Sequence, residues 1–186
     1  MKNFGITYSL LAIFALAACQ TEPTPYPSSD AYKLDNQAKA ALEKLYAANG
    51  KARHLRTKAK AILTFPTVIK VAFGGGIQIG NGVLTNMNGR TIGYYNSTAG
   101  SFGYQAGLKG FNYSLFLMSD RAIDRLEKAG GLQLGMGPSL IIVKKGKTIG
   151  FTTTTLDKDI YAFIYDVKGA YGGAGIEGTK ITRIHP

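Results

Sequence analysis

The sequence predicts an α+β fold, in which N-terminal helices precede a mainly antiparallel, glycine-rich β domain with one short inserted helix. Two observations carry this prediction. Apolar residues recur at helical spacing between residues 35 and 63, whereas β-branched and aromatic runs dominate from residue 68 onward. The strand candidates follow one another with short gaps and no crossover helices, which favours antiparallel pairing over a doubly wound sheet.

Two helices are expected first. Residues 35–48 carry an apolar stripe, and Asn49-Gly50 is a typical helix stop. Residues 51–63 carry a second stripe, and Pro66 prevents the helix from continuing. Both helices should therefore pack one face on a core. The stripes consist of Ala38, Ala41, Leu42 and Leu45 in the first helix, and of Leu55, Ala59, Ile62 and Leu63 in the second.

The rest of the chain is predicted to form strands around one further helix. The dipeptide Asn88-Gly89 is a strong hairpin signal between two apolar runs. A short helix is expected up to residue 128, because Ser119 or Asp120 can cap its first turn. The other strand candidates are residues 101–118, 140–143, 148–155, 160–167 and 179–184.

The N-terminus has the layout of a secretory signal over residues 1–18. Lys2 is followed by an uncharged, mostly apolar stretch that is too short for a comfortable membrane span. The stretch ends in Leu-Ala-Ala-Cys, which resembles the lipobox of bacterial lipoproteins, so Cys19 is the predicted lipidation site. Cys19 is the only cysteine and cannot form an internal disulfide. The alternative is a plain signal peptide with an unrelated cysteine.

The remaining organisation is simple. Residues 19–30 comprise the lipidated cysteine and a tether in which three prolines alternate with small polar residues, a composition typical of stiff spacers. Residues 31–186 suit a single domain with its own core. Gln20, where an aspartate often retains lipoproteins in the inner membrane, favours the outer membrane. We expect a lipid-anchored domain in the bacterial cell envelope, in the periplasm or at the cell surface.

Charge is distributed unevenly. The chain carries a formal net charge of +11, and no acidic residue occurs between Glu43 and Asp120. Ordinary protein surfaces intersperse the two signs, so a one-sided field of this length indicates an anionic partner. The unopposed cations of this interval are Lys44, Lys51, Arg53, Arg56, Lys58, Lys60, Lys70, Arg90 and Lys109.

The second predicted helix gathers several of these cations. Arg53, Arg56 and Lys60 share one face at i, i+3 and i+7, and Lys58 lies beside them. A helix that is basic on one side and apolar on the other can lie in a membrane interface, or it can pack on a core with a solvated basic face. Each Lys or Arg near an anionic lipid surface contributes about 1 kcal/mol, which salt screens.

Several blocks follow one another in a distinctive order. They are KAKAILTFP and VIKVAFGGG at residues 58–76, TIGYY and SFGYQAG at residues 91–107, and a closing block that includes GIEGTKI at residues 175–181. Together these blocks resemble the SYLF domain. The resemblance covers roughly residues 55–184. It implies lipid binding, because eukaryotic members bind phosphoinositide membranes and some bind actin, while bacterial members are largely exported lipoproteins. It also makes Lys58, Lys60 and Lys70 candidate headgroup contacts.

The expected partner is an anionic phospholipid or membrane surface. In a bacterial envelope this means phosphatidylglycerol, cardiolipin or lipopolysaccharide, whereas actin and phosphoinositides are not expected there. The alternative is an envelope scaffold that binds an acidic protein or a cell-wall polymer. A pI near 9.7 also suits nucleic acid, but the export signal argues against that partner. We expect a monomer.

No residue pattern indicates catalysis, a metal or a cofactor. With one cysteine and only His54 and His185, a soft metal site is not expected, and no Gly-x-Ser-x-Gly elbow occurs. Residues 173–178 match Gly-x-Gly-x-x-Gly, but too little chain follows for the helix that must receive a pyrophosphate, so tight turns are predicted there. A non-enzymatic protein without catalytic residues is predicted.

The tyrosines leave two interpretations open. Most aromatic residues should belong to the core or to a sheet face. Some could instead line an apolar groove for an acyl chain or lie at a membrane interface. The candidates are Tyr94, Tyr95, Tyr161 and Tyr165.

Overall fold

The computed structural model describes residues 29–128, 131–144, 147–149 and 159–186. The predicted signal peptide, Cys19, all but the last two residues of the tether and most of the strand expected at 148–155 lie outside these residues. Five strands form one antiparallel sheet in the order β1-β2-β5-β3-β4, which confirms the predicted α+β class. The elements are α1 (Ser29–Ala48), α2 (Gly50–Arg56), β1 (Ala61–Asn86), β2 (Thr91–Leu117), α3 (Asp120–Glu127), β3 (Leu132–Lys144), β4 (Lys147–Ile149) and β5 (Ile160–Ile184).

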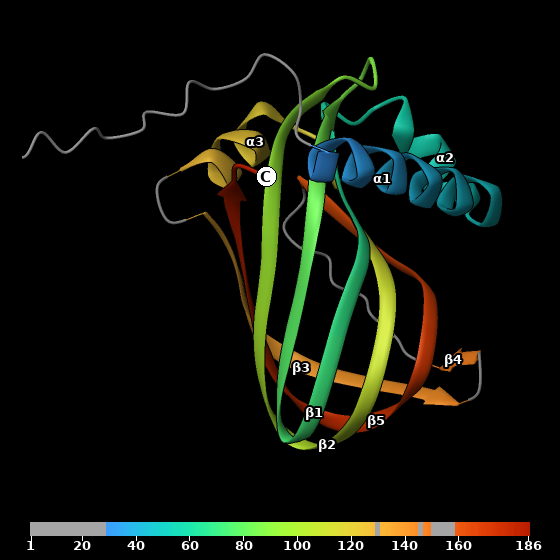
Figure 1. The fold of residues 1–186 in the computed structure, drawn as a ribbon, viewed down its shortest axis with the longest axis vertical. Helices are drawn as coiled ribbons and strands as arrows, with labels where there is room; N and C mark the ends of the chain where they lie inside the picture. Colours follow the sequence, from blue (N-terminus) through green and yellow to red (C-terminus); the bar gives the residue numbers. More distant parts are fainter. Residues whose placement is uncertain (1–28, 129–130, 145–146, 150–158) are drawn as a thin grey trace, which may run out of the picture.

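Strands β1, β2 and β5 are unusually long, and each turns over in its middle. Figure 1 shows that they run away from the helices, reverse at the opposite end of the molecule and return. We call the end covered by α1, α2 and α3 the helix end. The bend end comprises residues 73–76, 102–107 and 169–176, where the three strands turn over. The sheet is thereby folded on itself and has an inner face and an outer face.

Local irregularity makes the turn-over possible. The register of β1 against β2 shifts between Phe73 and Gly75, where β2 contributes more residues than β1 and bulges. Gly107 has φ 128°, and a Cβ there would stand 2.8 Å from the Cα of Tyr171 on the neighbouring strand. Only glycine allows the two backbones to approach so closely at this position. The glycines predicted to form tight turns at residues 173–178 instead lie within β5, so that prediction is wrong.

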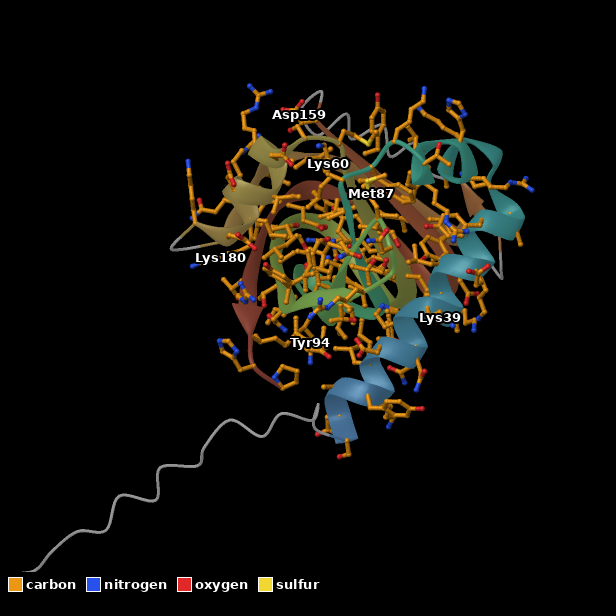
Figure 2. All side chains as sticks on the ribbon, turned by 90° about the horizontal axis from the view of Figure 1, so that it is seen from above. Lys39, Lys60, Met87, Tyr94, Asp159 and Lys180 are labelled. Carbon is orange, nitrogen blue, oxygen red and sulfur yellow. The ribbon has the colours of Figure 1, made fainter. Side chains whose placement is uncertain are left out.

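The main core lies between the two layers of the folded sheet, near the helix end. Phe65 stacks on Tyr113 with ring centroids 5.9 Å apart, and Leu115 is completely buried beside them. Side chains from both layers and from α3 meet here, and Figure 2 shows them filling the space that the sheet encloses. The fully buried members include Leu63, Phe65, Val68, Leu84, Tyr95, Leu115 and Leu117.

Helices α1 and α2 cover the outer face of the same region. Their apolar sides meet outward-facing residues of the strands, where the ring of Phe116 makes edge contacts with Tyr46 and Phe163. Asp35 ties α1 to β2, because its carboxylate accepts hydrogen bonds from Thr91 Oγ1 at 3.0 Å and Tyr94 Oη at 3.1 Å. Near the helix end, both faces of the sheet are therefore buried.

The other predicted elements divide into confirmed and corrected ones. The hairpin at Asn88-Gly89 is present, with φ 75° at Gly89, and α3 begins after its predicted cap Ser119. The strand candidate at 101–118 is part of β2, which continues through a register shift between Gly110 and Asn112. Strands predicted at 160–167 and 179–184 belong to the single strand β5. The first helix begins at residue 29 rather than 35.

The second helix is shorter than predicted. It ends at Arg56 instead of residue 63, and the amide groups of Lys58 and Ala59 both donate to the carbonyl of Leu55 as the turn closes. The chain then enters β1, where Ile62 pairs with Phe116. The predicted apolar stripe is still buried, because Leu55, Ala59 and Ile62 all join the cluster under α1.

Candidate functional site

The first candidate surface is the group of cations on and after α2. Arg53, Arg56, Lys58 and Lys60 are all exposed. Asn49 caps the helix by accepting a hydrogen bond from the Ala52 amide at 3.0 Å, and the buried side of α2 anchors it against the sheet. Since the helix ends at Arg56, Lys58 and Lys60 project from the following turn rather than from a helical face. We call these four side chains the basic cluster.

The four side chains of the basic cluster differ in their contacts with the rest of the protein. The guanidinium of Arg56 lies 4.9 Å from the ring centroid of Tyr46, and Lys60 Nζ lies 3.6 Å from a carboxylate oxygen of Asp120. Both contacts are at the surface and are worth little stability. In the described part of the chain, no acidic side chain pairs with Arg53 or Lys58. Two of the four charges are therefore available to an external anion.

The pKa of the neighbouring Tyr46 hydroxyl depends on its burial and on nearby charges. Burial raises the pKa of Tyr46 above its usual value, the charge of Arg56 opposes this rise, and Glu43 adds to it. The Tyr46 ring consequently stays neutral at physiological pH, with its face available to the guanidinium. This contact holds Arg56 against α1 and helps to fix the outline of the basic cluster.

Lys70, the fifth predicted lipid-contacting residue, lies elsewhere. It is on the inner face of β1, its exposure is 1%, and its ammonium pairs with Glu177 of β5. The ammonium also lies 5.3 Å from the ring centroid of Tyr171. The structure thus separates Lys70 from the basic cluster and places it inside the folded sheet, out of reach of a headgroup at the surface.

A second buried lysine stands beside it. Lys109 is the cross-strand partner of Lys70, has an exposure of 2%, and lies 4.7 Å from the Tyr171 ring centroid and 5.0 Å from that of Phe111. Burial lowers the pKa of Lys109 to about 8, with the charge of Lys70 acting in the same direction and Glu177 opposing both effects. Like charges directly opposite one another destabilise a strand pair, and the negative charge of Glu177 offsets this repulsion.

The remaining members complete an internal polar cluster. Gln105 accepts hydrogen bonds from Tyr171 Oη and, at 3.1 Å, from Ser101 Oγ. We call Lys70, Gln105, Lys109, Tyr171 and Glu177 the inner cluster. Sequence reasoning did not find it, because its members come from three strands and the ion pair joins residues 107 positions apart. The one available signal was Glu177, an isolated acid in a glycine-rich segment.

The tyrosines proposed as groove residues take other roles. Tyr95 is fully buried, Tyr94 bonds to Asp35, and Tyr161 lies under Lys51 with 5.2 Å between its ring centroid and Nζ. Tyr165 shares a hydrogen bond with Ser114 at 3.0 Å, and burial raises its pKa to about 12. The core interpretation fits these four residues better than the groove interpretation.

The described residues offer little for other chemistry. Within them, no group of three or more His, Cys, Asp or Glu side chains is placed to hold a metal ion. Among the same residues, no helix has the length and apolar character required to cross a membrane. The inner cluster is an ion pair enclosed by aromatic rings, and the basic cluster is a surface suited to anions.

These features define a class of small α+β domain, with a folded sheet around an internal ion cluster and exposed cations at one end. Residues 98–185 match the family model described as "Ysc84: Las17-binding protein actin regulator". Over these residues the chain is similar to the Ysc84, or SYLF, family, which agrees with the resemblance found in the sequence. The matched region contains Lys109, Tyr171 and Glu177, while the basic cluster and Lys70 precede it. No curated protein and no solved structure shows significant similarity to the chain.

Proposed function

We propose that this chain is a membrane-anchored, non-enzymatic lipoprotein that binds phospholipid and contacts anionic lipid with its basic cluster. The observation that carries the proposal is the exposure of Arg53 and Lys58 without an acidic partner in the described residues, next to Arg56 and Lys60. Each such cation near an anionic leaflet contributes about 1 kcal/mol. The similarity of residues 98–185 to this family supports a binding role.

The proposed anchor and the basic cluster act together. A lipidated Cys19 and the tether at 19–30 keep the domain next to a bilayer of the cell envelope, and we favour the outer membrane. Contacts worth only a few kcal/mol then suffice, because tethering makes the second binding event intramolecular. The cluster sets the orientation of the domain on the leaflet, while the acyl chains provide the attachment.

The test is vesicle flotation with residues 20–186, which lack Cys19 and retain every element described above. We expect binding to vesicles of phosphatidylglycerol or cardiolipin, no comparable binding to neutral vesicles, and weakening by salt. The double variant Arg53→Glu/Lys58→Glu should lower the partition coefficient at least about tenfold, because two attractive charges become repulsive.

A matched control reverses the same number of charges elsewhere. Lys128 and Lys180 are exposed, and Figure 2 places Lys180 on the side of the molecule away from α2. The variant Lys128→Glu/Lys180→Glu should bind much more strongly than the α2 variant at equal net charge. An equal loss of vesicle binding in both variants would mean that binding depends only on the net charge of the domain. Absence of binding to any vesicle would leave membrane attachment to the anchor and favour the scaffold alternative.

A further inference from the structure

The bend end carries large apolar side chains on its outer face, and nothing in the described residues covers them. Phe73, Phe102 and Tyr104 are 92%, 81% and 96% exposed. Neighbouring outward-facing positions on the same three strands are also apolar and more than half exposed. They are Val71, Ile77, Ile79, Leu108 and Ile176. An apolar surface of this extent, contiguous across strands, marks an interaction site on a globular domain.

This end of the molecule reverses the usual arrangement of a sheet. Inward positions of β1 and β2 carry Lys70, Gln78, Gln105 and Lys109, which are buried, while the intervening outward positions carry apolar residues. The ion pair with Glu177 keeps the polar side chains inside. At this level of the strands, the polar side chains therefore face inward and the apolar side chains face outward.

The β1 and β2 parts of this surface carry no charge. In the sequence, no Asp, Glu, Lys or Arg occurs at residues 71–89 or 91–108, and Glu177, the acid of β5 nearest the bend, points inward to Lys70. The basic cluster lies at the opposite end of the molecule, whereas three lysines border the bend of β5, namely Lys144, Lys147 and Lys168. An uncharged patch matches the hydrocarbon of a bilayer, where even one exposed charge costs several kcal/mol, while a bordering lysine such as Lys168 can reach the headgroups.

A groove runs along this surface. It has a volume of 920 Å³ and is lined by Val71, Phe73, Ile77 and Phe102, together with glycine backbone at Gly75 and Gly76. The wall of the groove is tightly packed at Gly76, because a Cβ there would stand only 2.6 Å from Ser101 Oγ and 2.9 Å from Ala72 Cβ. Its apolar lining suits acyl chains of the contacted leaflet.

We propose that the bend end inserts its aromatic side chains into the acyl layer of a phospholipid bilayer, as a second membrane contact opposite the basic cluster. The inference rests on the proposed function in assuming that the domain works beside a membrane. A bilayer fits better than a protein partner because the three rings are almost fully exposed at the turn of the strands, and β1 and β2 place no charge beside them to confer specificity. The hydroxyl of Tyr104 suits the polar interface, as tyrosines at membrane boundaries do.

The chain contains no tryptophan, so a single introduced indole reports its own depth. The experiment uses the full-length chain, expressed and processed in bacterial cells, with Phe73→Trp as the probe and Tyr32→Trp on α1 as the control. Both positions are exposed, at 92% and 64%. Each variant is mixed with neutral phosphatidylcholine vesicles at high salt, with or without bromine on the acyl chains. Neutral lipid and high salt remove any contribution from the basic cluster.

We expect acyl-chain bromine to quench the indole emission of the Phe73→Trp variant at least about twofold and to leave that of Tyr32→Trp nearly unchanged. Phe102→Trp should behave like Phe73→Trp. Unquenched emission at both bend positions, or equal quenching of the α1 control, overturns the inference, while a failure of salt-sensitive binding to anionic vesicles affects only the proposed function. A concentration-dependent blue shift of the Phe73→Trp variant without vesicles would identify a second copy of the chain as the occupant and would also overturn it.

A loss-of-contact variant gives an independent test. In residues 20–186, which lack the proposed anchor, Phe73→Ser/Phe102→Ser/Tyr104→Ser should lower partitioning into neutral vesicles at least about tenfold, whereas Tyr32→Ser should not. Exposed positions contribute little to folding, so circular dichroism and the denaturation midpoint of the triple variant should stay close to those of the parent chain. Unchanged partitioning of a folded triple variant would contradict insertion through the bend end.

Discussion

The two halves of the folded sheet use the same three strands in opposite ways. Near the helix end, inward residues such as Phe65 and Leu115 form an apolar core, and α1 and α2 cover the outer face. Near the bend end, inward residues such as Lys70 and Lys109 form a charged cluster, and the apolar outer face is bare. Alternation along a strand decides which residues share a face, but it does not decide which face is buried.

The difference teaches how a long strand can change environment without a break. In β2, the odd-numbered positions face inward from Tyr95 to Leu117, yet they pass from apolar to polar and back to apolar. The inner cluster tolerates this change because Lys70 pairs with Glu177, the charge of Glu177 also favours the charged form of Lys109, and both ammonium groups lie against the Tyr171 ring. The folded shape is therefore retained where hydrophobic packing alone would not support it.

The largest effect should come from the glycine that permits the turn-over. Gly107→Ala places a Cβ against the backbone of Ala170 and Tyr171 at a φ of 128°, so we expect a loss of about 4 kcal/mol or failure to fold. Gly100→Ala is the matched control, because nothing lies within 4 Å of its Cβ and its φ is ordinary. It should change stability by less than about 1 kcal/mol. Urea denaturation measures both, and similar losses would contradict this account of the bend.

The next effect tests the ion pair within the inner cluster. Glu177→Gln leaves two buried ammonium groups without a carboxylate, and we expect a loss of about 3 kcal/mol in the free energy of unfolding. Glu127→Gln removes the same charge from a pair with Arg183, where both side chains are almost half exposed. It should cost less than about 1 kcal/mol. Equal costs in urea denaturation would show that the inner cluster is no more than a surface pair.

The smallest effect concerns the pH dependence contributed by Lys109. Its pKa is lowered to about 8 in the folded protein, against 10.5 when unfolded, so the unfolded chain binds more protons between these values. Its charged form therefore costs stability below pH 8, and this cost disappears as the pH rises toward 10.5. The stability advantage of Lys109→Met over the parent chain should shrink by about 2 kcal/mol between about pH 7 and pH 10.

Tyrosines ionise in both the parent chain and the Lys109→Met variant, so their contribution cancels in the stability difference. The remaining pH dependence is that of Lys109. Unfolding curves in urea at several pH values supply the measurement. An advantage that stays constant across this range would mean that Lys109 keeps an ordinary pKa in the folded chain.

The sequence predicted the class of fold and most element types, because these depend on local signals. The hairpin at Asn88-Gly89 and the cap at Ser119 follow from the conformations that those residues favour. The second helix was overextended because Leu55, Ala59 and Ile62 repeat at a spacing that suits a helix, while long-range pairing with β2 draws Ile62 into a strand. Local pattern and tertiary pairing compete there, and pairing prevails.

The candidate site was predictable only in part. Exposure of Arg53, Arg56, Lys58 and Lys60 agrees with the expected basic surface. The position of Lys70 was not predictable, since alternation in Val68-Ile69-Lys70-Val71 would ordinarily place the lysine in solvent and the two neighbours inside. The structure does the reverse because Glu177, far along the chain, supplies the countercharge. No local window contains that information.

The continuity of the long strands has a mechanical consequence. From the helix end to the bend end, β1 runs over residues 61–73 with one register shift between Phe65 and Val68, and at about 3.3 Å per residue it spans up to about 40 Å. The paired strands contain no loop along that length, which limits how far the two ends can move relative to each other. A partner at the basic cluster and a partner at the bend end are therefore kept apart by a distance that depends on the number of residues in the strand.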